Sequence, residues 1–336
     1  MKKEVVLVFR KRFAHTFSIE FIFDNLIASL NRSYAIKKYV LPRFSNSFSH
    51  RIINLFSMLR LRHKIVHVTG DVHYAILGAW FCMRVLTIHD LAFMHQNIGV
   101  KRSILKWLWI TLPVKFAHQV TVISEATKND LLGYVAVDPK KIKVIPDFIS
   151  ETYQPVSNRI FNPDRPQILQ IGTAFNKNIP RLAAALAGIP CTLTIIGKLN
   201  ETQKTALAKF KIACINKVDL TEKDLYQEYA KADFLTFVST IEGFGMPVLE
   251  AQACGLPVIT SNCSSMPEVA GNAAVLVDPC DIASVRNGVL QIISNENLRK
   301  ELIKKGFENV KRFSKEKIVE QYASLYQELE NRSSGN

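Results

Sequence analysis

The sequence has few of the motifs that hold metal ions. Its six cysteines never form a Cys-x-x-Cys pair, no Asp-x-Asp occurs, and no His/Cys/Asp cluster has the spacing of metal ligands. No Ser/His/Asp or Cys/His arrangement of a nucleophilic hydrolase stands out. A transferase that binds a diphosphate through a cation would need a carboxylate pair for that cation. The sequence therefore predicts no metal site and no resident cofactor.

Long apolar runs are also absent. The run Val5–Phe9 is followed at once by Arg10, Lys11 and Arg12, and it is too short for a signal peptide or a membrane span. No other run is long enough to cross a bilayer. Scattered cysteines in apolar contexts suit small buried side chains in a reducing compartment. We expect a cytoplasmic protein, with or without peripheral contact at the inner face of the plasma membrane.

Composition and charge bound the remaining classes. The 336 residues are 48% hydrophobic and 21% charged, which excludes a disordered chain and predicts two domains. Residues 1–165 hold 24 Lys+Arg against 11 Asp+Glu (+13), whereas residues 166–336 hold 19 against 18 (+1). The basic half favours an anionic partner, either an anionic membrane surface or a lipid-pyrophosphate acceptor, or has a basic surface without one. No recognition motif supports nucleic acid, so no nucleic-acid partner is expected.

A strand, a glycine turn and a helix start follow one another in the second half. Asp233–Ser239 has the apolar, β-branched and aromatic content of a buried strand. Gly243 and Gly245 form the turn, and Met246–Ala253 is predicted as a helix with proline in its first turn. Ligands bind at such strand ends in open parallel sheets, and the free N–H groups of the helix attract anions.

Two carboxylates flank this predicted anion site. Glu242 and Glu250 would be repelled by an anionic ligand unless they accepted hydrogen bonds from another part of it, and sugar hydroxyls are suitable donors. A sugar linked to phosphate therefore fits. The alternative is that Glu242 is a solvated loop residue and Glu250 a charge on the helix surface. A second candidate phosphate turn, Gly172–Asn178, carries Lys177, which is otherwise an exposed lysine at a helix start.

Polar residues also follow the strands predicted in the first half. Lys64–Thr69 leads to His73, and Arg84–Ile88 leads to His89. Each histidine is either a functional residue or simply a side chain at a strand end whose hydrogen bonds are made within the protein. The basic turn that begins at Arg10 and Lys11 either holds an acceptor phosphate or is merely solvated.

Two stretches of the first half, Arg51–Lys64 and Lys101–His118, combine basic and apolar residues. The first is predicted as a helix leading into a strand, and the second carries Trp107 and Trp109. A basic amphipathic helix with tryptophans can lie on a membrane. The alternative is that each helix packs its apolar face on the sheet.

The run from Glu242 to Glu250, with Gly-Phe-Gly-Met-Pro between them, resembles the signature of the family 4 retaining glycosyltransferases, also called group 1. Ala253–Asn262 and Met266–Gly271 resemble the segments that follow in that family. The resemblance implies an α/β fold of GT-B architecture, in which two Rossmann-like domains with parallel sheets face a central cleft. We expect an acceptor-binding domain over 1–158, a nucleotide-sugar-binding domain over 159–313, and a helix over 314–336 that crosses back to the first.

The resemblance also implies roles for several candidate residues. Glu242 and His89 would be catalytic. Lys177 would contact the diphosphate of the donor, and Glu250 would contact its ribose. The residues that would bind the donor are Gly172, Thr173, Lys177, Gly243, Phe244, Gly245 and Glu250. The family's acceptor contacts cannot be transferred to this sequence, and Arg10, Lys11 and His73 are acceptor-binding candidates on their own positions. Two departures are clear, because Thr173 stands where the family commonly has arginine and residues 10–17 lack its glycine-rich loop.

The function implied is a retaining, metal-independent transfer of a hexose of the mannose or glucose type. The donor would be a nucleotide-diphosphate sugar, the acceptor a glycan or lipid-linked molecule, and the pathway bacterial cell-surface polysaccharide biosynthesis. Alternatives are a non-catalytic partner of a glycan assembly complex and a nucleotide-sugar epimerase on the same fold. The sequence leaves open the sugar, nucleotide, linkage and oligomeric state, and whether Thr173 lowers activity.

Overall fold

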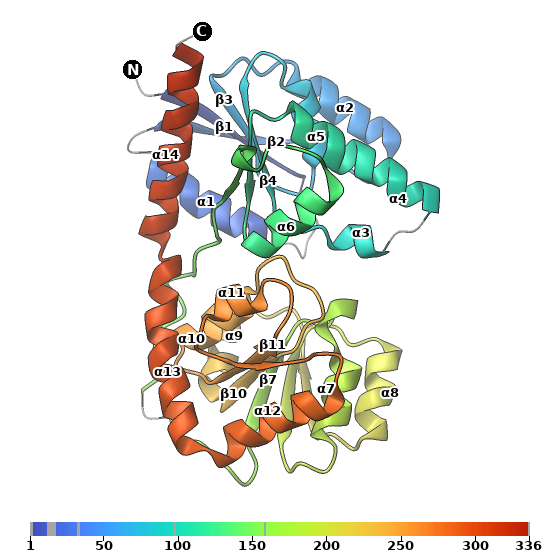
Figure 1. The fold of residues 1–336 in the computed structure, drawn as a ribbon, viewed down its shortest axis with the longest axis vertical. Helices are drawn as coiled ribbons and strands as arrows, with labels where there is room; N and C mark the ends of the chain where they lie inside the picture. The colour runs from blue at the N-terminus through green and yellow to red at the C-terminus, as the bar shows by residue number, and fades with distance from the viewer. Residues whose placement is uncertain (1–2, 12–17, 32–33, 97–98, 158, 335–336) are drawn as a thin grey trace. The chain divides into compact units, whose positions relative to one another are not determined.

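The computed structural model describes residues 3–11, 18–31, 34–96, 99–157 and 159–334. They form two units, residues 1–148 with 315–336 and residues 149–314 (Figure 1). The sequence analysis placed the boundary after residue 158, whereas residues 149–157 group with the second unit. The backbone shows why, because Ile149 N–H donates to the Phe313 carbonyl and Val156 N–H to the Cys254 carbonyl.

The first unit is built on a parallel sheet with the strand order β2-β1-β3-β4-β5-β6 among its described residues. The strands are β1 (Lys3–Phe9), β2 (Tyr34–Val40), β3 (Ile65–Val68), β4 (Met83–Ile88), β5 (Gln119–Val122) and β6 (Ile142–Val144). Side chains alternate between the two faces of each strand. Val5 and Leu7 therefore enter one hydrophobic core, and Val6 and Val8 enter the other.

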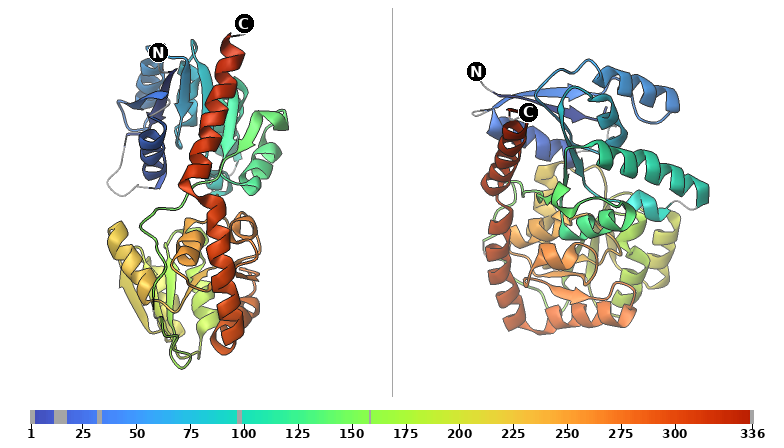
Figure 2. Two further views of the ribbon diagram at one scale, coloured as in Figure 1. Left: turned by 90° about the vertical axis from the view of Figure 1, so that its left-hand side faces the viewer. Right: turned by 45° about the horizontal axis from the view of Figure 1, so that its top comes forward.

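Helices cover both faces of this sheet. Helices α1 (Ser18–Leu30) and α14 (Lys315–Ser334) pack on the first core, and α14 runs along this unit in both views of Figure 2. The other core receives α2 (Phe48–Met58), η1 (His73–Gly78), α5 (Leu112–Phe116) and α6 (Glu125–Tyr134). Helix α14 continues to Ser334.

The stretch Lys101–His118, expected as one helix, is divided into consecutive segments. They are α4 (Gly99–Leu105), the π-helical segment η2 (Lys106–Thr111) and α5, and α3 (Ala92–Gln96) precedes them. Pro113 stands in the first turn of α5, where its missing N–H is tolerated. The π-helical segment shifts the helix face, so Ile110 is buried while Trp107 is 55% exposed.

The second unit has a parallel sheet in the order β12-β11-β10-β7-β8-β9 among its described residues. The strands are β7 (Gln167–Ile171), β8 (Thr192–Ile196), β9 (Cys214–Lys217), β10 (Phe234–Phe237), β11 (Val258–Ser261) and β12 (Val275–Val277). The helices are α7 (Ile179–Leu186), α8 (Glu201–Lys209), α9 (Glu222–Lys231), α10 (Met246–Ala253), α11 (Met266–Ala270), α12 (Ile282–Ser294) and α13 (Glu296–Val310). The predicted helix over Met246–Ala253 is confirmed.

Each sheet has a point where the strand order reverses, and ligands of open α/β sheets bind there. In the second unit this point lies between β7 and β10, and in the first it lies between β1 and β3. The loops that follow these four strands carry most of the candidate site residues. The α/β fold with two Rossmann-like units is confirmed.

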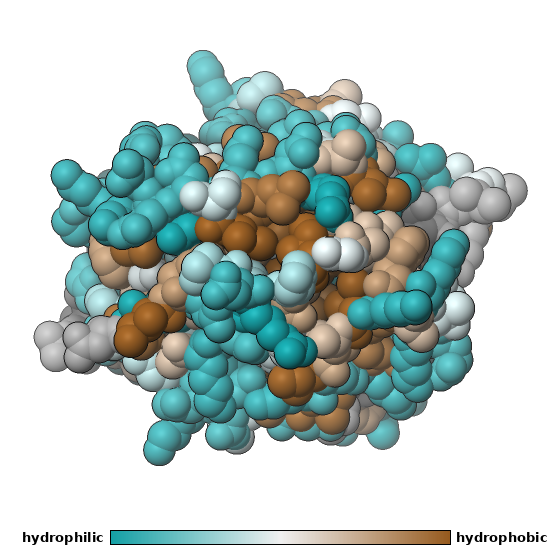
Figure 3. Space-filling view, turned by 90° about the horizontal axis from the view of Figure 1, so that it is seen from below, coloured by the Kyte–Doolittle hydropathy of each residue, from teal (hydrophilic) through white to brown (hydrophobic). Residues whose placement is uncertain are grey.

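The surface carries hydrophobic side chains beside charged ones. Figure 3 shows a face on which hydrophobic residues gather near the centre and hydrophilic residues surround them. On α2 of the first unit, Phe48 is 75% exposed and Phe56 is 60% exposed. No helix among the described residues is both long enough and apolar enough to span a membrane.

Candidate functional site

The loops after β7 and β10 meet at an ion pair in the second unit. Lys177 Nζ lies 2.5 Å from Glu242 Oε1, and Asn176 Nδ2 donates to the same oxygen at 3.0 Å. Asn176 also joins the backbones of the two loops, since its side chain donates to the Ile241 carbonyl and its own carbonyl accepts from Thr240 N–H. The structure thus brings Lys177 and Glu242 together at the point where the strand order reverses.

The path of the Lys177 side chain depends on Gly172. This glycine has φ = 86°, a region that other residues rarely adopt. A Cβ built on it would lie 2.8 Å from Lys177 Cε, so the aliphatic stem of the lysine occupies that space. The ammonium group ends 4.3 Å from the centroid of the Phe237 ring. Lys177 is therefore a partly buried, fixed cation and not the exposed helix-start lysine of the alternative interpretation.

The turn between Glu242 and α10 is fixed by two serines. Glu242 N–H donates to Ser264 Oγ at 3.0 Å, and Ser265 Oγ donates to the Phe244 carbonyl at 2.7 Å. Gly245 has φ = 118°, and a Cβ there would lie 2.4 Å from Met266 Cε. The turn presents the Glu242 carboxylate beside the start of α10, where Pro247 stands in the first turn.

Thr173 is held on the opposite side of the β7 turn. Its carbonyl accepts a hydrogen bond from Gln203 Nε2 at 2.8 Å, and Gln203 belongs to the capping box of α8. A Cβ built on Gly197 would lie 2.9 Å from the Thr173 hydroxyl oxygen, so the threonine side chain packs against this glycine. The residue thus fixes the loop by packing, and it supplies no positive charge.

Glu250 is held by tyrosines that the sequence analysis did not identify. Tyr229 Oη donates to Glu250 Oε2 at 2.6 Å, and Tyr153 is a further hydrogen-bond partner. The two tyrosine rings pack edge to face with centroids 5.5 Å apart. Burial raises the pKa of Glu250 to about 7, even though the tyrosine hydroxyls favour its charged form.

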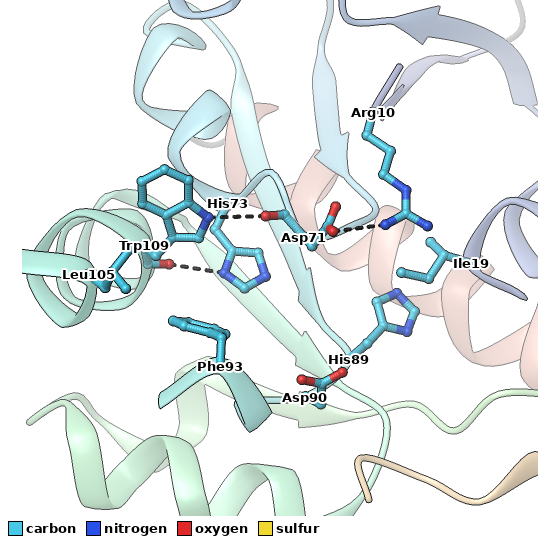
Figure 4. Close-up of a pocket in the computed structure, with 9 residues that line it drawn as sticks. All are labelled: Arg10, Ile19, Asp71, His73, His89, Asp90, Phe93, Leu105 and Trp109. Atoms are coloured by element: carbon cyan, nitrogen blue, oxygen red, sulfur yellow. Dashed lines mark hydrogen bonds and ion pairs between the residues drawn. The ribbon is translucent and has the colours of Figure 1, made fainter. Parts of the chain in front are cut away.

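A pocket of about 390 Å³ lies in the first unit, at the ends of β1, β3 and β4 (Figure 4). It is lined by Arg10, Ile19, Asp71, His73, His89, Asp90, Phe93, Leu105 and Trp109. The structure thus brings together Arg10, His73 and His89, which the sequence analysis singled out separately. Lys11 does not line the pocket, because it is exposed with its ammonium 4.9 Å from the centroid of the Phe44 ring. Arg12 lies outside the described residues.

The charge of Arg10 is already matched by two carboxylates. Its Nε donates to Glu20 Oε1 at 2.9 Å and its Nη1 to Asp71 Oδ2 at 2.8 Å. Glu20 is only 1% exposed. Since Glu20 belongs to the first turn of α1 and Asp71 follows β3, this ion-pair network ties together three parts of the sheet edge.

The two histidines of the pocket have defined hydrogen bonds. His73 Nδ1 lies 3.0 Å from the Trp109 carbonyl, which accepts only, so Nδ1 carries the proton. Burial lowers the pKa of His73 and keeps the ring neutral. His89 Nε2 likewise donates to the Thr69 carbonyl at 2.9 Å, and its Nδ1 lies 4.0 Å from Asp147 Oδ2.

Sequence reasoning missed the residues that support both sites. Asn176, Ser264 and Tyr229 carry no motif, and their role depends on contacts between distant segments. A weak signal existed only for Asp71, which follows directly on a predicted strand end. Among the described residues, no group of three or more His, Cys, Asp and Glu side chains is placed to hold a metal ion.

Two family models match the chain in succession. The model of glycosyltransferase family 4 matches residues 8–153, and the model of glycosyl transferases group 1 matches residues 156–309. The break between the two matches lies close to the break between the two structural units.

Individual proteins give similar matches. O-antigen chain mannosyltransferase B of Escherichia coli is 37% identical over 108 residues, which span 32% of this chain and 28% of that protein. Sucrose-phosphate synthase of Thermosynechococcus elongatus has a similar fold, with a TM-score of 0.79 and 18% identity over 98% of this chain and 100% of that chain. The Anabaena protein HepE, solved with UDP and glucose, has a TM-score of 0.75 and 12% identity over 97% of this chain and 100% of that chain.

Proposed function

Because the chain belongs to the glycosyltransferases of family 4 and group 1, we propose that it transfers a sugar from a nucleotide-diphosphate sugar to a glycan or lipid-linked acceptor. The observation that carries this proposal is the contact between Lys177 and Glu242 beside the start of α10. A cation and a carboxylate at the positive end of a helix dipole suit a ligand that has both phosphates and hydroxyls.

Different residues of the second unit bind different parts of the donor. Lys177 and the positive end of the α10 helix dipole neutralise the leaving diphosphate, and Glu242 accepts hydrogen bonds from the sugar hydroxyls. Glu250 holds the nucleotide ribose. In a retaining transfer, the bond from the anomeric carbon to the phosphate oxygen breaks while the acceptor oxygen attacks the same face. The leaving phosphate takes the acceptor proton, and His89 is proposed as a further catalytic residue.

The donor is proposed to carry a hexose of the mannose or glucose type. The similarity to an O-antigen mannosyltransferase and to a fold solved with UDP and glucose supports this choice. The same similarity supports a role in the synthesis of cell-surface polysaccharide. We place the reaction at the cytoplasmic face of the membrane, where a lipid-linked acceptor would be presented.

The transfer is proposed to need no metal ion, because the sequence contains no Asp-x-Asp that would hold a cation at the diphosphate. We expect full activity in the presence of EDTA. The measurement is the rate of donor consumption with and without chelator. A loss of activity that magnesium or manganese restores would contradict metal independence.

The direct test of the function is a panel of nucleotide sugars, screened first by thermal shift and then by turnover. A true donor present at a hundredfold excess over its dissociation constant stabilises the folded protein by about 2.7 kcal/mol. Transfer of the sugar with retained anomeric configuration would support the proposal. Binding of a donor without turnover on any acceptor would favour the non-catalytic partner of a glycan assembly complex instead.

A further inference from the structure

We propose that the pocket of the first unit binds a neutral sugar residue of the acceptor, and not an acceptor phosphate. The inference rests on the proposed function, because it assigns the pocket to the acceptor. It also bears on Arg10, for which the sequence left open an acceptor phosphate or a merely solvated turn. Three properties of the pocket support it: its charge balance, its exposed hydrogen-bond acceptors and its apolar walls.

The charge balance disfavours an anionic ligand. Among the described residues that line the pocket, Arg10 is the only Lys or Arg, and Asp71 and Asp90 are both carboxylates. Arg10 already contacts Glu20 at 2.9 Å and Asp71 at 2.8 Å. A phosphate bound here would have to compete with both carboxylates for one guanidinium group and would be repelled by Asp90.

Apart from Arg10, the polar atoms that remain are acceptors, which suit sugar hydroxyls. His73 is only 3% exposed, and its protonated Nδ1 is used by the Trp109 carbonyl, so Nε2 carries a lone pair. Figure 4 shows this second nitrogen pointing away from Trp109 and into the space between the labelled residues. An acceptor aimed into a cavity can take a hydrogen bond from a ligand hydroxyl. Asp71 and Asp90 also line the pocket, although Asp71 Oδ2 accepts from Arg10 and Asp90 Oδ1 from Ala92 N–H, and each carboxylate has a second oxygen.

The remaining walls are apolar and fixed. Ile19, Phe93 and Leu105 line the pocket together with Trp109. The indole of Trp109 is held in place because its Nε1 donates to the Asp71 carbonyl at 3.2 Å and Arg51 lies 4.6 Å from its ring centroid. A volume of about 390 Å³ with apolar walls and a few converging polar atoms is typical of a small-ligand site. The apolar faces of a pyranose ring fit such walls.

The test is direct binding to the full-length chain, which does not depend on turnover. Matched probes differ only by a phosphate: mannose and mannose 6-phosphate, glucose and glucose 6-phosphate, and N-acetylglucosamine and its 6-phosphate. Saturation-transfer NMR and calorimetry give the affinities. We expect at least one neutral sugar to bind more tightly than its phosphorylated partner. Stronger binding of the phosphorylated sugars that is lost in Arg10→Gln would overturn the proposal.

Variants assign the binding to the pocket. His73→Asn keeps a donor near the Nδ1 position and removes Nε2, and we expect it to weaken the neutral sugar about tenfold. Asp71→Asn should weaken binding of the neutral sugar and strengthen binding of its phosphorylated partner, because Arg10 would lose one of its two carboxylate partners. Asp138→Asn is the matched control, since Asp138 caps a turn elsewhere in the unit.

A donor-site variant, Lys177→Met, should leave sugar binding unchanged. Equal binding in wild type, His73→Asn and Asp71→Asn, or no binding of any neutral probe, would refute the proposal. Thermal-shift binding of nucleotides to the second unit's site is scored separately. A chain that binds nucleotides but no neutral sugar thus contradicts only this inference, and a chain that binds neutral sugars but no nucleotide contradicts only the proposed function.

Discussion

The two units share one architecture but present opposite chemistry at their sheet edges. In the second unit, the cation Lys177 contacts a single carboxylate, Glu242, in the loop that leads into the start of α10. In the first unit, Asp71 and Asp90 share a pocket with one cation, Arg10. The net charges of the two halves show the opposite contrast, since residues 1–165 carry +13 and residues 166–336 carry +1.

This contrast shows that the net charge of a domain does not give the charge of its binding site. The excess lysines and arginines of the first half lie mainly outside the pocket, and the one that lines it is matched by two carboxylates. The second half has a net charge near zero, yet it holds Lys177, the cation that is best placed to bind a ligand. Variants in each unit can test whether the second unit binds the donor and the first unit binds the acceptor, as their local chemistry implies.

The largest expected effect comes from removing the cation of the second unit. Lys177→Met should lower kcat by about 10²–10³, because a preorganised donor is lost where negative charge develops on the leaving phosphate. Steady-state kinetics with the donor found by the panel give the value. The control is Lys204→Met, which removes an exposed lysine paired with Glu201 and should leave kcat unchanged. An unaltered kcat in Lys177→Met would remove the assignment of this site.

The partner carboxylate should show a smaller effect that depends on the lysine. Glu242→Gln should depress kcat more than it weakens donor binding, since an amide oxygen accepts less strongly from a sugar hydroxyl. In unfolding experiments, the cost of Lys177→Met should shrink by on the order of 1 kcal/mol when Glu242→Gln is also present, because no uncompensated carboxylate remains. Additive effects on stability would show that the contact is not energetically coupled.

Glu250 allows a test that links pH to stability. Its pKa is raised from an ordinary 4.5 to about 7, so the folded state favours the neutral carboxyl. The wild type should therefore lose stability relative to Glu250→Gln as the pH rises from about 4.5 to about 7. The difference in Tm between the two proteins, measured at about pH 5 and about pH 8, checks this sign. A difference that does not change with pH would contradict the raised pKa.

Glu250→Gln should also weaken nucleotide binding about tenfold, if the residue holds the ribose. Calorimetry with the nucleotide alone measures this without turnover. The comparison variant is Tyr229→Phe, which removes one hydrogen bond to Glu250 and keeps the carboxyl group. Unchanged affinity in Glu250→Gln would move the ribose site elsewhere.

The sequence predicted most of the fold because central strands are apolar on both faces. Phe234–Phe237 is fully buried, and its apolar run was recognised within Asp233–Ser239. The sequence analysis identified no strand at β2, β9 or β12. All three are edge strands. Exposed residues, such as Lys37 and Lys38 in β2, interrupt the apolar pattern of the first two, and β12 is only three residues long. The family resemblance is confirmed.

The candidate sites were less predictable than the fold. Glu242 and Lys177 could be named individually, but their contact depends on the register of β7 against β10, which no local pattern encodes. The sequence left open whether Arg10 holds a phosphate or is merely solvated, because neither Glu20 nor Asp71 is adjacent to it in sequence. Its partners become visible only once the sheet edge is assembled.

The smallest expected effect concerns the surface of the first unit. Phe48, Ile52 and Phe56 lie along one side of α2 and remain exposed, and Arg60 and Arg62 follow them. Trp109, by contrast, lines the pocket. We predict weak binding to anionic vesicles through this stripe, because each nearby basic residue contributes about 1 kcal/mol.

Sedimentation with vesicles of anionic and of neutral lipid, at low and high salt, measures this binding. Phe48→Ser with Phe56→Ser should reduce it several-fold, since both apolar groups would leave the interface. Leu290→Ser in the second unit, an exposed apolar residue of α12, is the control and should change nothing. Salt should weaken the attraction because it shortens the Debye length. Equal binding to neutral vesicles, or no binding to anionic vesicles at low salt, would leave the basic charge of the first half unrelated to membranes and favour an acceptor in solution.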